Sequence, residues 1–163
     1  MPPPRHADAG KLGRPETDPD RDENDARAGR RAYSASKLCN VLTARELARQ
    51  LAPERPDLMV AAFDPGFTPG TGLARDYPGP VGMIFRFALP PVAGLSEKVS
   101  TPANSGRLLA ELATSPRYQT ARGGYFALRG TTLVERQPSK LAQDPRLAER
   151  LWRDSAAMVG LLG

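Results

Sequence analysis

A helical pattern that leads directly into a short apolar run and a Pro-Gly turn limits most what this chain can fold into. From about Arg30 to Ala52, apolar residues recur at three- and four-residue spacing, and Pro53 and Pro56 end the pattern. Residues 58–63 are an unbroken apolar run, which is typical of a strand buried on both faces. A helix, a turn, a strand and a loop in this order are half of a crossover unit, so we expect an α/β fold with a parallel sheet.

Two residues of complementary chemistry lie on the expected helix. Tyr33 and Lys37 are four positions apart, which places both side chains on one helix face. A neighbouring ammonium favours the phenolate and lowers the pKa of a tyrosine from its usual ~10. Such pairs occur on many helices without catalytic meaning, but here only small residues separate the two. Pro65 and Gly66 then follow the strand, at the edge where doubly wound sheets bind ligands. The pattern indicates half of a nucleotide-dependent oxidoreductase.

The chain divides into an arm and one domain. Residues 1–29 are rich in Pro, Asp and Arg and poor in large apolar residues, which predicts a flexible arm or loop. Residues 30–163 form the domain, within which residues 67–95 are a loop and helix segment that either covers a substrate or packs on the core. Further elements are expected as two helices and a strand at residues 101–114, 145–162 and 123–128.

Charge and composition exclude several classes of function. The net charge is +5, but residues 1–32 hold seven basic and seven acidic side chains, and no basic run suits nucleic acid. No apolar stretch approaches the ~20 residues of a membrane span, and none follows Met1 as in a secretory signal. Cys39 is the only cysteine, which fits a cytoplasmic protein. His6, the only histidine, has no partner ligands around it in the sequence, so no metal site is expected.

Several motifs together carry a resemblance to a known family. Residues 32–40 read Ala-Tyr-Ser-Ala-Ser-Lys-Leu-Cys-Asn, the Pro-Gly loop follows, and Gly-Gly-Tyr-Phe stands at residues 123–126. Residues 151–161 read Leu-Trp-x-x-Ser-x-x-x-Val-Gly-Leu. The chain from about residue 30 onward resembles the carboxyl-terminal part of short-chain dehydrogenases/reductases, in the protochlorophyllide reductase and retinol-dehydrogenase-like branch. The resemblance implies a partial Rossmann-like, doubly wound parallel sheet.

The resemblance also implies roles for individual residues. Tyr33 would donate a proton during reduction, and Lys37 would lower its pKa and hydrogen-bond the nicotinamide ribose. Pro65 and Gly66 would meet the nicotinamide through their backbone. The contacts to the carboxamide or the phosphates would come from Thr68 and Thr71. The implied cofactor is NADP, with NAD left open, and the implied substrate is an apolar small molecule carrying a carbonyl or alcohol.

The chain also departs from the family pattern. No glycine-rich nucleotide turn after a first strand precedes Tyr33, so the front half of the domain, with its pyrophosphate cradle, is expected to be missing. Phe67 stands where the photoactive reductases carry a cysteine, which argues against protochlorophyllide photoreduction. The chain is therefore either the carboxyl-terminal part of a reductase or a non-catalytic remnant that acts by associating with a partner. A homodimer or the missing amino-terminal half is the expected partner.

Overall fold

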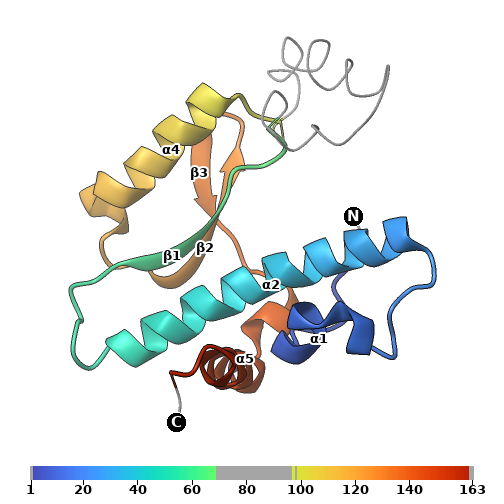
Figure 1. Cartoon of the computed structure of the whole chain (residues 1–163). Coiled ribbons are helices and arrows are strands. Elements are labelled where there is room, and N and C mark those ends of the chain that lie inside the picture. The colour runs from blue at the N-terminus through green and yellow to red at the C-terminus, as the bar shows by residue number, and fades with distance from the viewer. Residues whose placement is uncertain (1, 69–96, 98, 162–163) are drawn as a thin grey trace. The chain divides into compact units, whose positions relative to one another are not determined.

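The computed structural model describes residues 2–68, 97 and 99–161. The described elements, drawn in Figure 1, are α1 (Ala9–Gly13), η1 (Pro15–Thr17), α2 (Asp25–Leu51), β1 (Val60–Asp64), α4 (Pro102–Thr114), η5 (Pro116–Tyr118), β2 (Arg122–Arg129), β3 (Thr132–Glu135), η6 (Lys140–Gln143) and α5 (Pro145–Met158), where η marks a 3-10 helix. They form two compact units: Met1–Val60 with Gln137–Gly163, and Ala61–Arg136. We call these the helical unit and the sheet unit.

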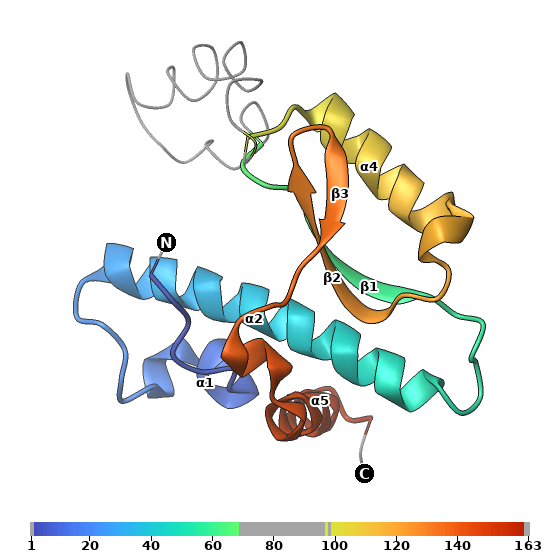
Figure 2. The same cartoon turned by 180° about the vertical axis from the view of Figure 1, so that it is seen from behind.

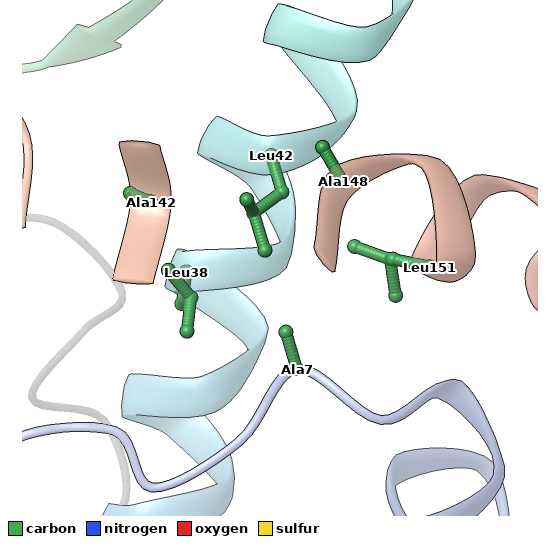
Figure 3. Packing of buried hydrophobic residues seen from close by; sticks show 6 residues of the cluster. All are labelled: Ala7, Leu38, Leu42, Ala142, Ala148 and Leu151. Atoms are coloured by element: carbon green, nitrogen blue, oxygen red, sulfur yellow. The ribbon is translucent and has the colours of Figure 1, made fainter. Parts of the chain in front are cut away.

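The core of the helical unit lies where α2 meets α5, η6 and the residues before α1 (Figure 3). Leu38 and Leu42 are one helical turn apart on α2, and Leu42 is fully buried. Leu151 of α5 belongs to the same cluster, and so does Ala7, which is only 1% exposed. The remaining buried members are Ala142 and Ala148. The apolar stripe expected on this helix therefore holds the unit together.

The first 29 residues have more local structure than the expected arm or loop. Asp8 caps α1 by accepting a hydrogen bond from the Lys11 amide at 3.0 Å. The Lys11 ammonium pairs with Asp18 at 2.9 Å and with Asp20 at 2.6 Å. Asn24 caps α2, which begins at Asp25, earlier than the expected helix start near residue 30. Helix caps and ion pairs order this segment. The sequence analysis did not predict this order, because it judged the segment by its scarcity of apolar residues.

The sheet unit contains a three-stranded sheet in the order β1-β2-β3 (Figure 2). The sheet is mixed, because β2 and β3 are antiparallel, with Phe126 opposite Glu135 and Arg129 opposite Thr132. The expectation of an all-parallel sheet is thus wrong for β3, which the sequence analysis did not predict. Only two residues separate β2 from β3, which suits a hairpin and is too short for a parallel crossover. The α/β class is confirmed, and the fold is consistent with part of a Rossmann-like domain.

Helix α4 covers the sheet of this unit (Figures 1 and 2). Thr101 caps it by accepting from the Asn104 amide at 3.2 Å, with Pro102 in the first turn, as predicted. Leu108 and Leu112 form its buried stripe. The strand expected at residues 123–128 and the helices expected at 101–114 and 145–162 are confirmed, although α5 ends at Met158.

Two further observations concern the expected organisation. Within the described residues, no helix is long and apolar enough to cross a membrane. Most of the expected cover segment at residues 67–95, and Thr71 with it, lies outside the described residues.

Candidate functional site

Tyr33 and Lys37 lie on one face of α2, as their spacing predicts. The Lys37 Nζ is 5.2 Å from the centroid of the Tyr33 ring, which is a cation–π arrangement. Tyr33 is 42% exposed, and Lys37 is also exposed. A phenol hydroxyl and an amine side chain are therefore both accessible to a ligand on this face.

The side chains between Tyr33 and Lys37 make contacts within the helical unit itself. The Ser34 hydroxyl donates to the Arg30 carbonyl at 3.1 Å, and the Ser36 hydroxyl donates to the Tyr33 carbonyl at 2.8 Å. Ala35 is buried. Cys39 packs against the core, and burial raises the pKa of its thiol, which keeps the sulfur protonated and inert. Among residues 33–37, the exposed functional groups are thus those of Tyr33 and Lys37.

In the sheet unit, a tight turn follows β1 at Pro65 and Gly66. Gly66 has a φ of 68°, a left-handed conformation that glycine adopts without steric cost. Its amide donates to the Asp64 carboxylate Oδ1 at 2.9 Å, so the turn is an Asx turn. Beyond the turn, the Ser100 amide donates to the Phe67 carbonyl at 2.9 Å in a parallel bridge with the segment before α4.

Buried hydroxyl groups lie behind this turn. Ser105 of α4 and Thr68 both donate to the Pro65 carbonyl at 3.4 Å, and their own oxygens are 3.4 Å apart. The Ser105 hydroxyl also lies 3.0 Å from the Ser100 hydroxyl, so its single hydrogen is shared between Ser100 and the Pro65 carbonyl as alternative acceptors. Asn104 joins Ser100 to the Gly130 carbonyl, with distances of 3.1 and 3.0 Å. The first turn of α4 is therefore connected to the Pro-Gly turn through side chains.

The second oxygen of Asp64 has a partner from β2. The Tyr125 hydroxyl donates to Asp64 Oδ2 at 2.8 Å. Burial, together with this hydrogen bond to a carboxylate, raises the pKa of Tyr125 to about 12. Tyr125 is therefore a neutral donor at physiological pH, and Asp64 holds the turn with one oxygen and β2 with the other.

The structure brings the predicted residues together in two groups, Tyr33 with Lys37 in the helical unit and Pro65, Gly66 and Thr68 in the sheet unit. Sequence reasoning missed Asp64, Tyr125, Ser100 and Ser105. The sequence Asp-Pro-Gly carried a usable signal, because an aspartate two residues before a glycine favours an Asx turn.

A further glycine pattern was also missed. Gly66, Gly70 and Gly72 have the spacing Gly-x-x-x-Gly-x-Gly, although the family turn is expected before Tyr33. Gly70 and Gly72 lie outside the described residues, and the spacing alone is a weak signal.

Comparison with known proteins shows which proteins this sequence is similar to. No protein-family model matches the chain. The chain is 34% identical to protochlorophyllide reductase A, chloroplastic, of Oryza sativa subsp. japonica over 136 residues, which are 82% of the chain and 34% of that protein. It is 33% identical to the Hordeum vulgare protochlorophyllide reductase A over 135 residues, 82% of the chain and 33% of that protein. The Avena sativa protochlorophyllide reductase is 33% identical over 135 residues, 82% of the chain and 41% of that protein. The chain is thus similar to the carboxyl-terminal part of protochlorophyllide reductases, which belong to the short-chain dehydrogenase/reductase family.

The match covers only part of the length of these relatives. The chain spans about a third of the length of the rice and barley reductases and matches their carboxyl-terminal part. The family and the region that the sequence analysis named are thereby confirmed. The rice and barley relatives are named as chloroplastic, and a cytoplasmic location for this chain stays a prediction.

Proposed function

We propose that the chain is the carboxyl-terminal part of an NADP-dependent short-chain oxidoreductase, with Tyr33 as its general acid and base. The observation that carries this proposal is the exposed Tyr33–Lys37 pair on α2, with the Lys37 ammonium 5.2 Å from the ring centroid. Homology to protochlorophyllide reductases over 82% of the chain supports it. The proposed substrate is an apolar small molecule with a carbonyl, an alcohol or a reducible alkene.

The division of labour follows from the groups on the chain. Bound NADPH supplies the hydride, and the protein supplies position and a proton. Reduction of a carbonyl also requires a proton on the oxygen. The Tyr33 hydroxyl donates this proton as the C=O double bond becomes a single bond. In this proposal the Lys37 ammonium, which lies over the Tyr33 ring, would offset the negative charge left on the tyrosine after the proton has moved. In the oxidation direction the same tyrosine accepts the proton of the alcohol.

The chemistry of these groups fits the nicotinamide end of the cofactor. The Lys37 ammonium and the Tyr33 hydroxyl would bind the ribose hydroxyls. For the sheet unit by itself, and from the family resemblance, we propose that the turn at Pro65 and Gly66 contacts the ring and its carboxamide, because glycine leaves the backbone uncovered there. Thr68 supports this turn from behind, and Thr71 is proposed as a further contact from sequence alone. The pyrophosphate cradle is assigned to residues that would precede Tyr33 in a longer protein.

The test is a chimera in which this chain replaces the homologous part of the rice reductase. The chimera is assayed for NADPH-dependent reduction of apolar aldehydes and ketones, and of protochlorophyllide in light. Removal of the Tyr33 hydroxyl in Tyr33→Phe should lower kcat by about 10²–10⁴-fold, the usual contribution of a general acid. Tyr118→Phe is the matched control, because it removes a hydroxyl that lies 3.5 Å from Glu111 in the sheet unit. Wild-type turnover in Tyr33→Phe contradicts the assignment.

A second candidate function is supported by the extent of the match. Since the chain spans about a third of the rice relative, a non-catalytic remnant that acts by associating with a partner is the alternative. A chimera without any NADPH-dependent activity, combined with a purified chain that does not bind NADPH, favours this alternative.

A further inference from the structure

We propose that Tyr125 and Asp64 are a positioning pair that holds the Pro65–Gly66 turn in the conformation that receives the nicotinamide. This inference rests on the proposed function, since it concerns the same cofactor site. It adds a role for two residues to which the sequence analysis assigned none, although Tyr125 stands within the Gly-Gly-Tyr-Phe motif.

The first argument is the geometry of the Asp64 carboxylate. Its Oδ1 accepts the Gly66 amide at 2.9 Å, and its Oδ2 accepts the Tyr125 hydroxyl at 2.8 Å. A side chain held through both oxygens has lost its rotamer freedom, so the Gly66 amide has one fixed acceptor. Without Tyr125, the carboxylate could rotate toward water and release the turn.

The second argument is the protonation state of the pair. Tyr125 is half-buried on β2, and its raised pKa keeps it a donor over the whole physiological range. A phenolate in its place would repel Asp64. The hydrogen bond therefore has one direction, from phenol to carboxylate, and the full negative charge of Asp64 remains available to the Gly66 amide.

The third argument is that the turn is held from two sides. Asp64 and Tyr125 restrain it through β2, while the Ser105 hydroxyl restrains the Pro65 carbonyl through α4. The contact of Ser105 with the Pro65 carbonyl is long, at 3.4 Å, whereas both contacts of Asp64 are short. The carboxylate contacts are hence the stronger restraint, and Tyr125 is the residue whose loss should loosen the turn.

The experiment measures the exchange of the Gly66 amide hydrogen in the full chain by NMR. Tyr125→Phe, which keeps the ring, should speed this exchange by about tenfold, the effect of one lost hydrogen bond of ordinary strength. Asp64→Ala should speed it further, because the acceptor itself is removed. Asp64→Asn, which keeps one oxygen for Gly66 but loses the charge and the acceptor for Tyr125, should speed it by less than Asp64→Ala does. Tyr118→Phe is the control and should leave Gly66 unchanged.

The cofactor is tested separately in the chimera with the rice reductase. Tyr125→Phe should raise the KM for NADPH by about tenfold or lower kcat, whereas the control Tyr118→Phe should leave both unchanged. Unchanged Gly66 exchange in Tyr125→Phe overturns the positioning pair, whatever happens to the melting temperature. Faster exchange of the Gly66 amide with an unchanged kcat and an unchanged KM for NADPH would show that the contact between Tyr125 and Asp64 is purely structural. That result also overturns the positioning pair. Failure of the wild-type chimera to bind NADPH overturns the proposed function instead, and the exchange result still decides whether Tyr125 holds the turn.

Discussion

At the scale of single residues, the titratable groups that matter are those fixed by hydrogen bonds. Glu46 is 1% exposed on α2, and its carboxylate accepts from Arg49 at 2.6 and 2.9 Å and from Gln50 at 2.8 Å. The Arg49 hydrogen bonds lower the pKa of Glu46, against the opposing effect of its burial. An anion on the buried face of a helix is stable here because its partners come from the next turn.

Glu46→Gln should therefore lower the free energy of unfolding by about 1–3 kcal/mol at neutral pH. The lowered pKa means that the contribution of the carboxylate is present above its unfolded pKa and is lost as the pH falls through the folded pKa. The difference between wild type and variant should thus shrink below about pH 5. Urea unfolding at several pH values measures it, with Glu54→Gln as an exposed control. A difference that is constant from neutral to acidic pH would remove the charge from the explanation.

Tyr125 gives the opposite pH dependence. Its folded pKa of about 12 lies above the ordinary value of 10.0, so its contribution to stability is complete below pH 10. This contribution is lost as the pH rises toward 12, because the unfolded tyrosine ionises first. The stability difference between wild type and Tyr125→Phe should therefore fall over this interval in denaturant titrations. A difference independent of pH would mean that the Tyr125 hydroxyl is not buried against Asp64.

At the scale of elements, α2 is the main support of the helical unit. Leu42 is fully buried between α2, α5 and the residues before α1. Leu42→Ala should cost about 2–5 kcal/mol, from lost transfer free energy and the cavity that remains. The only tryptophan, Trp152, lies on α5, so its fluorescence reports the unfolding of this unit. Leu109→Ala, at a site 49% exposed on α4, should change stability by less than about 0.5 kcal/mol. Equal effects of the two substitutions would contradict this core.

The elements also show what the sequence could predict. Local signals were sufficient for α2, α4 and α5, because spacing, caps and prolines act within a few residues. Strand β3 was missed, since four residues after a two-residue connection carry little periodicity of their own. Helix α1 was missed because its capping by Asp8 does not depend on apolar residues.

The candidate site divides in the same way. Tyr33 and Lys37 could be found because their relation is a helical repeat of four. Asp64 and Tyr125 are 61 positions apart, and only the pairing of strands brings them together. The hydroxyl contact between Thr68 and Ser105 spans 37 positions and is equally invisible to local patterns. The relation between residues that are close in the sequence could therefore be predicted. The contacts that restrain the Pro-Gly turn could be found only from the folded structure.

At the scale of the whole molecule, the last prediction concerns how strongly the chain alone binds NADPH, since the chain matches only part of the length of its relatives. The proposed nicotinamide contacts belong to this chain, while the pyrophosphate cradle is assigned to residues preceding Tyr33 in a longer protein. The chain alone should therefore bind NADPH weakly. The chimera should bind it with a Kd in the micromolar range, so 1 mM NADPH, roughly 100 times that Kd, should stabilise the chimera by about 2.7 kcal/mol.

Thermal unfolding measures this difference directly. The chimera should melt several degrees higher with NADPH, whereas the 163-residue chain should shift by less than about one degree. In the chimera, Lys37→Met should reduce the shift, because the ribose hydroxyls lose a charged donor. Lys140→Met, on η6, is the matched control for the loss of a lysine charge. If the chain alone shifts as far as the chimera does, it carries a complete nucleotide site of its own. The assignment of the cradle to preceding residues would then be wrong, while the roles of Tyr33 and Lys37 would stand.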